Sequence, residues 1–183
     1  SQGAFVAICG RDQETLERAR TSLRREAGDG AEVLAVPCDV AEPEDVAELV
    51  AKVVATWGQL DVLVNNAATI QVAPLETLRR KDFEDAMGIA FWGTVHATLE
   101  ALPHLRRSGG RIANITSIGG KVAIPHLLPY DCAKFAVLGF SEGLRAEVAR
   151  DGVSVTTVVP GLAIVALAAS DPQEQMRWRG VAV

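Results

Sequence analysis

The 183-residue chain carries 18 Lys and Arg against 23 Asp and Glu, a formal charge of −5, and 49% of its residues are hydrophobic. This composition excludes a disordered chain and fits a single globular domain. The mild acidity argues against a nucleic acid or an anionic membrane as partner, because both need a basic surface.

Neither a membrane span nor a signal peptide is expected. The apolar run at residues 162–169 has eight residues, whereas a spanning helix needs roughly 20, and the first four residues lack the pattern of a secretory signal. Cys9, Cys38 and Cys132 form no CxxC pair. We interpret them as core thiols of a cytoplasmic protein and expect no metal.

Short apolar runs alternate with longer amphipathic segments along the chain. We predict strands at residues 5–9, 33–36, 60–64, 111–117 and 154–159. Helices are predicted from a cap at Asp12 to residues 28–30, and over residues 43–57, 78–107 and 129–150. Pro43 fits the first turn of its helix, and Pro103 is expected to bend or break the last turn of the third.

This alternation of strands and helices indicates an α/β fold with a doubly wound parallel sheet, of the Rossmann-like kind. Ligands bind beyond the carboxyl ends of the strands in such sheets. Five segments are predicted to meet there: Gly10-Arg11, Asp39-Val40, residues 65–68, Thr116-Ser117 and Pro160-Gly161.

Tyr130 and Lys134 are four residues apart and would share one face of a helix. An ammonium near a phenol favours the phenolate, so the pair predicts a tyrosine that acts as general acid and base. Ser117 closes a strand at the same edge and could hold a carbonyl or alcohol oxygen. Taken alone, the pair is better explained as a surface contact between a tyrosine and a lysine.

Further motifs accompany the pair in a fixed order: Asn65-Asn66-Ala67-Ala68 after one strand, Asn114 to Ser117 at the end of another, and Pro160-Gly161 after the last. Together they resemble the classical short-chain dehydrogenase/reductase family from Gly3 to about Leu162. The resemblance implies a nicotinamide-dependent oxidoreductase. Tyr130 would exchange the proton, Ser117 would position the substrate oxygen, and Lys134 would hold the nicotinamide ribose and lower the tyrosine pKa.

The resemblance also implies the residues that hold the cofactor. Asp39, beside Val40, would contact the adenine, Asn65 and Ala67 the adenosine ribose, and Pro160-Gly161 the nicotinamide amide. Asp39 and Asn65 also fit ordinary turn chemistry at strand ends. Arg11 follows the first strand, where an arginine accommodates the 2′-phosphate of NADP(H), so NADP(H) is favoured over NAD(H). A solvated arginine at a helix start is the alternative.

Three departures from the family pattern stand out. The family's first strand and its Gly-rich turn have no counterpart in the sequence, and the Thr that the family usually has a few residues after Pro160-Gly161 is missing. We therefore interpret residues 1–183 as a single oxidoreductase domain that is incomplete at the N-terminus and around residues 163–170. Ala90 stands where the family usually has an Asn that holds a relay water; its main-chain carbonyl is retained.

The sequence therefore predicts an NADP-dependent oxidoreductase acting on a small carbonyl or alcohol, with Ser117, Tyr130 and Lys134 as catalytic residues. The alternative is a non-catalytic or regulatory relative that serves as a binding or oligomerisation module. Family resemblance implies that the helices at residues 78–107 and 129–150 pair across subunits, giving a homodimer or homotetramer.

Overall fold

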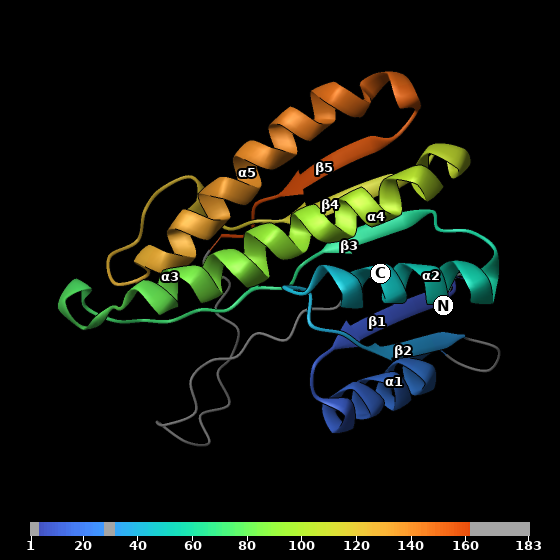
Figure 1. The fold of residues 1–183 in the computed structure, drawn as a ribbon, viewed down its shortest axis with the longest axis horizontal. Coiled ribbons are helices and arrows are strands. Elements are labelled where there is room, and N and C mark those ends of the chain that lie inside the picture. Colours follow the sequence, from blue (N-terminus) through green and yellow to red (C-terminus); the bar gives the residue numbers. More distant parts are fainter. Residues whose placement is uncertain (1–3, 28–31, 162–183) are drawn as a thin grey trace.

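The computed structural model describes residues 4–27 and 32–161 (Figure 1). The strands of this part are β1 (Val6–Gly10), β2 (Val33–Pro37), β3 (Val62–Asn65), β4 (Arg111–Ile115) and β5 (Ser154–Val158). Its α-helices are α1 (Gln13–Ala27), α2 (Pro43–Trp57), α3 (Arg80–Ala86), α4 (Gly93–Ser108) and α5 (Leu128–Val148). The predicted order of elements is confirmed, with strand ends moved by up to two residues.

All strand pairs in the described part are parallel, as the apolar strands predict. The sheet is in two pieces: β1 pairs with β2, and β3 pairs with β4, which pairs with β5. The edges of β1 and β3 share no ladder of hydrogen bonds. The family's first strand is expected between these two edges, and the incompleteness of the domain stays a prediction.

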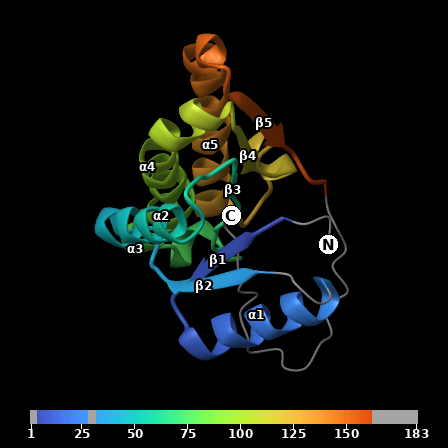
Figure 2. The same ribbon diagram turned by 90° about the vertical axis from the view of Figure 1, so that its right-hand side faces the viewer.

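In the described part, α1 lies on one face of the β1–β2 pair, and α2, α4 and α5 lie on the opposite face of the sheet (Figure 2). On one face, residues of α2 and α4 form the main core with residues from all five strands or the segments that flank them. On the other face of the β1–β2 pair, Leu16 of α1 packs against Ile8 and Val33. This two-sided cover is what a doubly wound fold requires, so the predicted fold class is confirmed.

Local signals for helix ends act as the sequence indicates. Asp12 Oδ1 accepts a hydrogen bond of 2.8 Å from the backbone N–H of Thr15 and so caps the start of α1. Pro43 lies in the first turn of α2, and Gly58 ends that helix in the left-handed conformation, with φ 77°. Residues 28–30, the predicted end of the first helix, lie outside the described residues.

The predicted single helix over residues 78–107 is wrong in detail. It consists of α3, a π-helical stretch at Met87–Trp92, and α4. Pro103 lies inside α4 and does not end it; the helix continues to Ser108 and stops at Gly109, which has φ 63°. Ala101 and Leu105 on either side of Pro103 are fully buried, and this packing outweighs the one backbone hydrogen bond that proline cannot donate.

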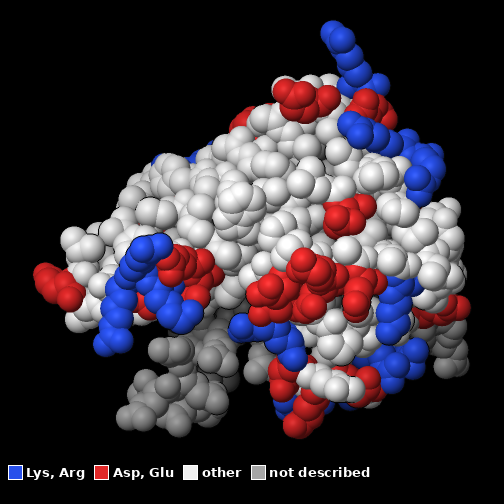
Figure 3. All heavy atoms as spheres, in the orientation of Figure 1, with Lys and Arg blue, Asp and Glu red and all other residues white. Residues whose placement is uncertain are grey.

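Charged side chains of both signs are interspersed on the face of the molecule that Figure 3 shows. Short-range ion pairs account for part of this pattern, including Arg80 with Glu84 and Lys81 with Asp85 on α3. Among the described residues, no helix is long and apolar enough to cross a membrane. The same residues contain no group of three or more His, Cys, Asp or Glu that could hold a metal ion.

Candidate active site

The structure brings the predicted site residues to one edge of the sheet. Gly10 ends β1, Asn65 ends β3, and Ser117 and Pro160 each follow two residues after the end of their strands. Because all strands run parallel, these carboxyl ends lie at the same edge. Tyr130 and Lys134 reach this edge from the first turns of α5.

Ser117 and Tyr130 form the centre of the site. Ser117 caps a short 3-10 turn at Ile118–Gly120, and its Oγ accepts a hydrogen bond of 3.1 Å from Gly119 N–H. Its side chain also lies close enough to that of Tyr130, which is 9% exposed, to lower the pKa of the phenol. The two hydroxyls predicted to handle a substrate oxygen are thus neighbours.

Lys134 lies one turn of α5 beyond Tyr130 and is only 3% exposed. Its Nζ donates a hydrogen bond of 2.8 Å to the carbonyl oxygen of Ile115, at the end of β4. The same Nζ is 5.7 Å from the centroid of the Tyr130 ring. Burial lowers the pKa of Lys134 to about 8, because the ammonium has lost most of its water.

The prediction that the pKa of Tyr130 is lowered is wrong. The pKa of Tyr130 is raised above the ordinary value of a phenol, chiefly by burial. The neighbouring Ser117 side chain acts in the opposite direction, and the neighbouring charge of Asp131 adds to the increase. Desolvation of the phenolate is therefore the largest effect on the pKa of Tyr130.

Arg11 and Asp39 form an ion pair across the ends of β1 and β2, with 3.5 Å between Arg11 Nη1 and Asp39 Oδ2. Asp39 Oδ1 also accepts a hydrogen bond of 3.1 Å from the backbone N–H of Ala41. Asp39 therefore stabilises a turn with one oxygen and pairs with Arg11 through the other, and its contact with an adenine stays a prediction. The Arg11 side chain is 62% exposed, so it is accessible to a ligand.

Val40, the neighbour of Asp39, is half-buried between strand β2 and the helices. Its side chain lies so close to Gly93 that a Cβ at that glycine would be 2.8 Å from Val40 Cγ2. Its carbonyl oxygen lies 3.3 Å from His96 Nδ1. These contacts fix the segment that carries Asp39 against α4.

Asn65 is buried, and its side chain points into a polar network instead of the crevice. Its Nδ2 donates to Asn114 Oδ1 at 2.8 Å and to Thr98 Oγ1 at 3.2 Å. Asn114 Nδ2 in turn donates to Ser141 Oγ at 2.8 Å. Since its side-chain amide is occupied by this network, any contact of Asn65 with a cofactor stays a prediction.

Ala67, Pro160 and Gly161 lie beyond the strand ends, as the sequence predicts. Ala67 is half-buried and lines an apolar cavity between β1, β3, α2 and α4. Pro160 and Gly161 are exposed. The carbonyl oxygen of Pro160 accepts a hydrogen bond of 2.9 Å from Ile118 N–H, which ties this segment to the turn after Ser117. Residues 163–170 lie outside the described residues.

Ala90, at the family's Asn position, is buried in the π-helical stretch. Its carbonyl oxygen accepts a hydrogen bond of 2.7 Å from Thr94 Oγ1. The carbonyl that was expected to replace the Asn contact is therefore present and already has one donor. Its part in a proton relay stays a prediction.

Asp131 and Ser141 were not predicted, and Asn114 was predicted only as the start of a strand-end motif; all three are buried polar residues. The signal for them is weak: polar side chains at helix and strand positions that face the core. Burial of such groups becomes visible only when the elements are packed.

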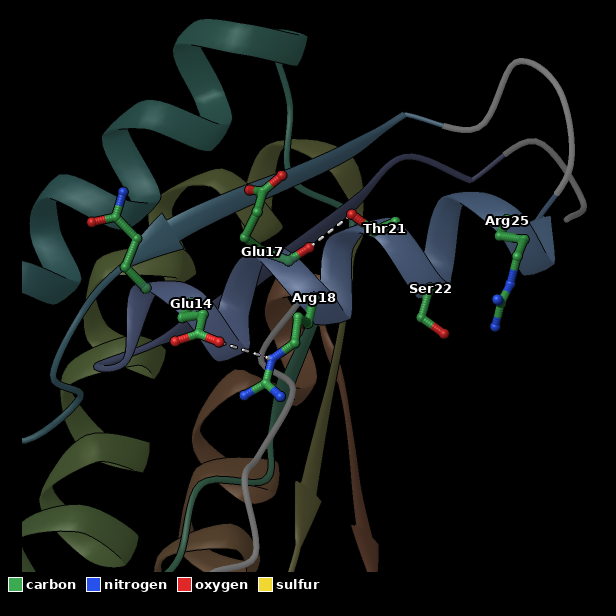
Figure 4. A pocket seen from close by; sticks show the side chains of 7 residues that line it. Glu14, Glu17, Arg18, Thr21, Ser22 and Arg25 are labelled. Atoms are coloured by element: carbon green, nitrogen blue, oxygen red, sulfur yellow. Dashed lines mark hydrogen bonds and ion pairs between the residues drawn. The ribbon is translucent and has the colours of Figure 1, made fainter.

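A separate hollow is lined by α1 residues alone, among them Glu14, Glu17 and Arg25, and shares none of the site residues (Figure 4).

The family model for short-chain dehydrogenases matches residues 1–175. The chain belongs to this family. The 11-beta-hydroxysteroid dehydrogenase-like 3 of Arabidopsis thaliana is similar to it, with 37% identity over 163 residues, covering 88% of this chain and 52% of that protein.

Solved structures of family members superpose closely. An alcohol dehydrogenase from the archaeon Thermococcus sibiricus, complexed with 5-hydroxy-NADP, has a TM-score of 0.80 and 28% identity, covering 87% of this chain and 66% of that chain. A gluconate 5-dehydrogenase from Burkholderia cenocepacia, in complex with NADP and tartrate, has a TM-score of 0.77 and 31% identity, covering 87% and 62%. This short-chain dehydrogenase chain spans about half to two thirds of the length of these relatives.

Proposed function

We propose that the protein is an oxidoreductase that transfers a hydride between NADP(H) and a carbonyl or alcohol substrate, with Tyr130 as general acid and base. The observation that carries this proposal is the contact between the Ser117 and Tyr130 side chains, with the buried Lys134 ammonium 5.7 Å from the phenol ring. Proton donor, oxygen-binding hydroxyl and cation meet at the sheet edge where family members bind their ligands.

The nicotinamide ring supplies or accepts the hydride at the substrate carbon. The protein handles the proton and the oxygen. In reduction, the Tyr130 hydroxyl donates its proton to the carbonyl oxygen as that oxygen becomes an alcohol, and Ser117 Oγ holds the oxygen in reach. A raised pKa keeps Tyr130 protonated at neutral pH, which suits the acid role in reduction.

The strand ends provide groups that suit the two halves of the cofactor. Arg11, with its exposed guanidinium, would bind a 2′-phosphate by charge-assisted hydrogen bonds. Asp39, Val40 and Ala67 would border the adenosine, and Lys134 and Pro160-Gly161 the nicotinamide riboside. Two similar solved structures contain NADP or 5-hydroxy-NADP. This likeness supports a preference of the present protein for NADP(H) over NAD(H).

The deciding experiment compares the wild type with Tyr130→Phe. NADPH oxidation with a panel of small ketones and aldehydes measures activity, and quenching of cofactor fluorescence measures binding. We expect Tyr130→Phe to bind NADPH as the wild type does and to reduce no carbonyl, because it lacks the proton that the product oxygen needs. A wild type that binds no nicotinamide cofactor contradicts the proposal.

That last outcome would favour a non-catalytic relative that works as a binding module, for which Ala90 is the supporting observation.

Self-association is compatible with either function. Trp92, Leu99 and Phe135 are 50%, 59% and 43% exposed along the π-helical stretch, α4 and α5, and we propose that these helices pair in a homodimer or homotetramer. We also propose that the protein is cytoplasmic and that its substrate is a small molecule.

A further inference from the structure

We propose that Asp131 is a positioning residue for the reaction: its buried carboxylate anchors the loop after Ser117 and acts through its charge on the neighbouring Tyr130 phenol. The role of Asp131 in catalysis rests on the proposed function. Its two physical parts, the anchor and the charge effect, can be measured without any enzyme activity.

Asp131 lies in the first turn of α5 and is 2% exposed. Its Oδ2 accepts a hydrogen bond of 2.7 Å from the backbone N–H of Ile124, seven residues earlier in the loop. Its own backbone N–H donates to the carbonyl oxygen of Leu127 at 2.9 Å. Both bonds hold the loop between Ser117 and Tyr130 against the start of α5.

The second oxygen of the carboxylate has no such partner. Within the described residues, Asp131 Oδ1 is buried and makes no hydrogen bond. It faces Gly119: a Cβ on that glycine would be 2.6 Å from Oδ1 and 3.3 Å from Cε1 of the Tyr130 ring. Since Gly119 N–H donates to Ser117 Oγ, Asp131 is packed against the turn that orients the catalytic serine.

A buried carboxylate with a hydrogen bond to only one of its oxygens destabilises the folded state, because burial of an unpaired polar atom is unfavourable. Burial accordingly raises the pKa of Asp131, while the hydrogen bond from Ile124 acts in the opposite direction. Loop anchoring alone would need one acceptor oxygen. The charge of the carboxylate as a whole also acts on Tyr130, whose pKa it helps to raise.

Few other charges face Tyr130. The segments Ile118–Gly120, Met87–Trp92 and β5, which pack against α5, contain no ionisable side chain. On α3, which also packs against α5, Arg80 pairs with Glu84 and Lys81 with Asp85, and Asp82 caps its own helix. Arg150 and Asp151 lie beyond the far end of α5, and Lys121 and His126 are exposed in the loop. On the helix of Tyr130, Asp131 and Lys134 are buried, whereas Cys132, the other titratable residue of these turns, is exposed.

The charge effect is tested with Asp131→Asn, which keeps an acceptor oxygen for Ile124 and removes the charge. Tyr130 is the single tyrosine of the chain, so NMR of protein labelled with carbon-13 at tyrosine Cζ reports its ionisation alone. We expect the titration midpoint of Tyr130 to move to lower pH in Asp131→Asn. Asp85→Asn, which removes an exposed charge on α3, should leave the midpoint unchanged. Equal midpoints in the wild type and Asp131→Asn overturn the charge effect.

The anchor is tested with Asp131→Ala, which removes the acceptor as well. Hydrogen exchange of the backbone should become faster over residues 118–127 in Asp131→Ala and stay near the wild-type rate in Asp131→Asn. Unchanged exchange in Asp131→Ala overturns the anchor. If Asp131→Asn does not fold, Asp131→Ser, which also lacks the charge, replaces it in the titration; if Asp131→Ala does not fold, Asp131→Leu, which also lacks an acceptor, replaces it in the exchange measurement. Neither measurement needs cofactor or substrate, so a protein without reductase activity can still give both expected results. Failure of the proposed function is therefore distinguishable from failure of this inference.

Discussion

Arg11 is the residue on which the proposed cofactor preference depends. Its guanidinium is largely exposed and paired at 3.5 Å with Asp39, so the pair is weak in water and can be exchanged for a phosphate. A 2′-phosphate offers an arginine a doubly charged partner with several acceptor oxygens. NADH lacks this phosphate and gains nothing from the arginine.

We therefore expect Arg11→Ala to weaken NADPH binding by about tenfold or more, as the loss of a charge-assisted hydrogen bond implies. NADH binding should change little. Fluorescence titrations with both cofactors check this, and Arg80→Ala, at an exposed position on α3, serves as the control. An equal loss for both cofactors would mean that Arg11 does not recognise the phosphate.

Lys134 makes a pH-dependent contribution to stability. Its pKa is about 8 in the folded protein, against 10.5 for an unperturbed lysine. Between these values the unfolded chain binds more protons than the folded one, so the free energy of unfolding rises with pH. At pH values below the pKa of Lys134 in the folded protein, the buried side chain is charged, and the full cost of burying the ammonium lowers the free energy of unfolding.

The variant Lys134→Met should remove this dependence. Compared with the variant, the wild type should gain roughly 2 kcal/mol of stability between about pH 7 and about pH 9.5. Urea unfolding of both proteins at a series of pH values measures the difference. Lys121→Met, at an exposed position, should follow the wild-type curve. Parallel curves for the wild type and Lys134→Met would show that the ammonium keeps its ordinary pKa.

At the scale of elements, a buried hydrogen-bond network joins the middle of the sheet to the helices. Asn65 on β3 and Asn114 on β4 are partners, Thr98 extends the network to α4, and Ser141 extends it to α5. The register of β3 and β4 places Asn65 opposite Asn114. The network holds α5, and with it Tyr130 and Lys134, in a fixed position relative to the strand ends.

Ser141→Ala should destabilise the protein by about 1–3 kcal/mol, because Asn114 Nδ2 loses its acceptor in a fully buried place. The free energy of unfolding in urea measures this loss. Ser154→Ala, at an exposed position on β5, should change it by no more than about 0.5 kcal/mol. Equal stability of Ser141→Ala and wild type would mean that the network does not fix α5.

At the scale of the whole molecule, the two pieces of the sheet run in the same direction and are covered by one continuous set of helices. The apolar core includes Ala7 of β1 and Leu63 of β3, although the two strands do not pair. Side-chain packing under α2 and α4 therefore holds the halves together. This arrangement keeps the ends of β1 and β2, with Arg11 and Asp39, on the same side as the Ser117–Tyr130 contact.

The sequence by itself determined the strands, the helices, the parallel sheet and the family, because apolar periodicity and short motifs are local properties of the chain. It also placed Ser117, Tyr130 and Lys134 in one site through their spacing. Tertiary structure decided what depends on burial: the raised pKa of Tyr130, the commitment of Asn65 to an internal network, the π-helical stretch around Ala90, and the half-bonded carboxylate of Asp131. Desolvation and hydrogen bonding between distant segments exist only once those segments are packed, so no local pattern could have indicated them.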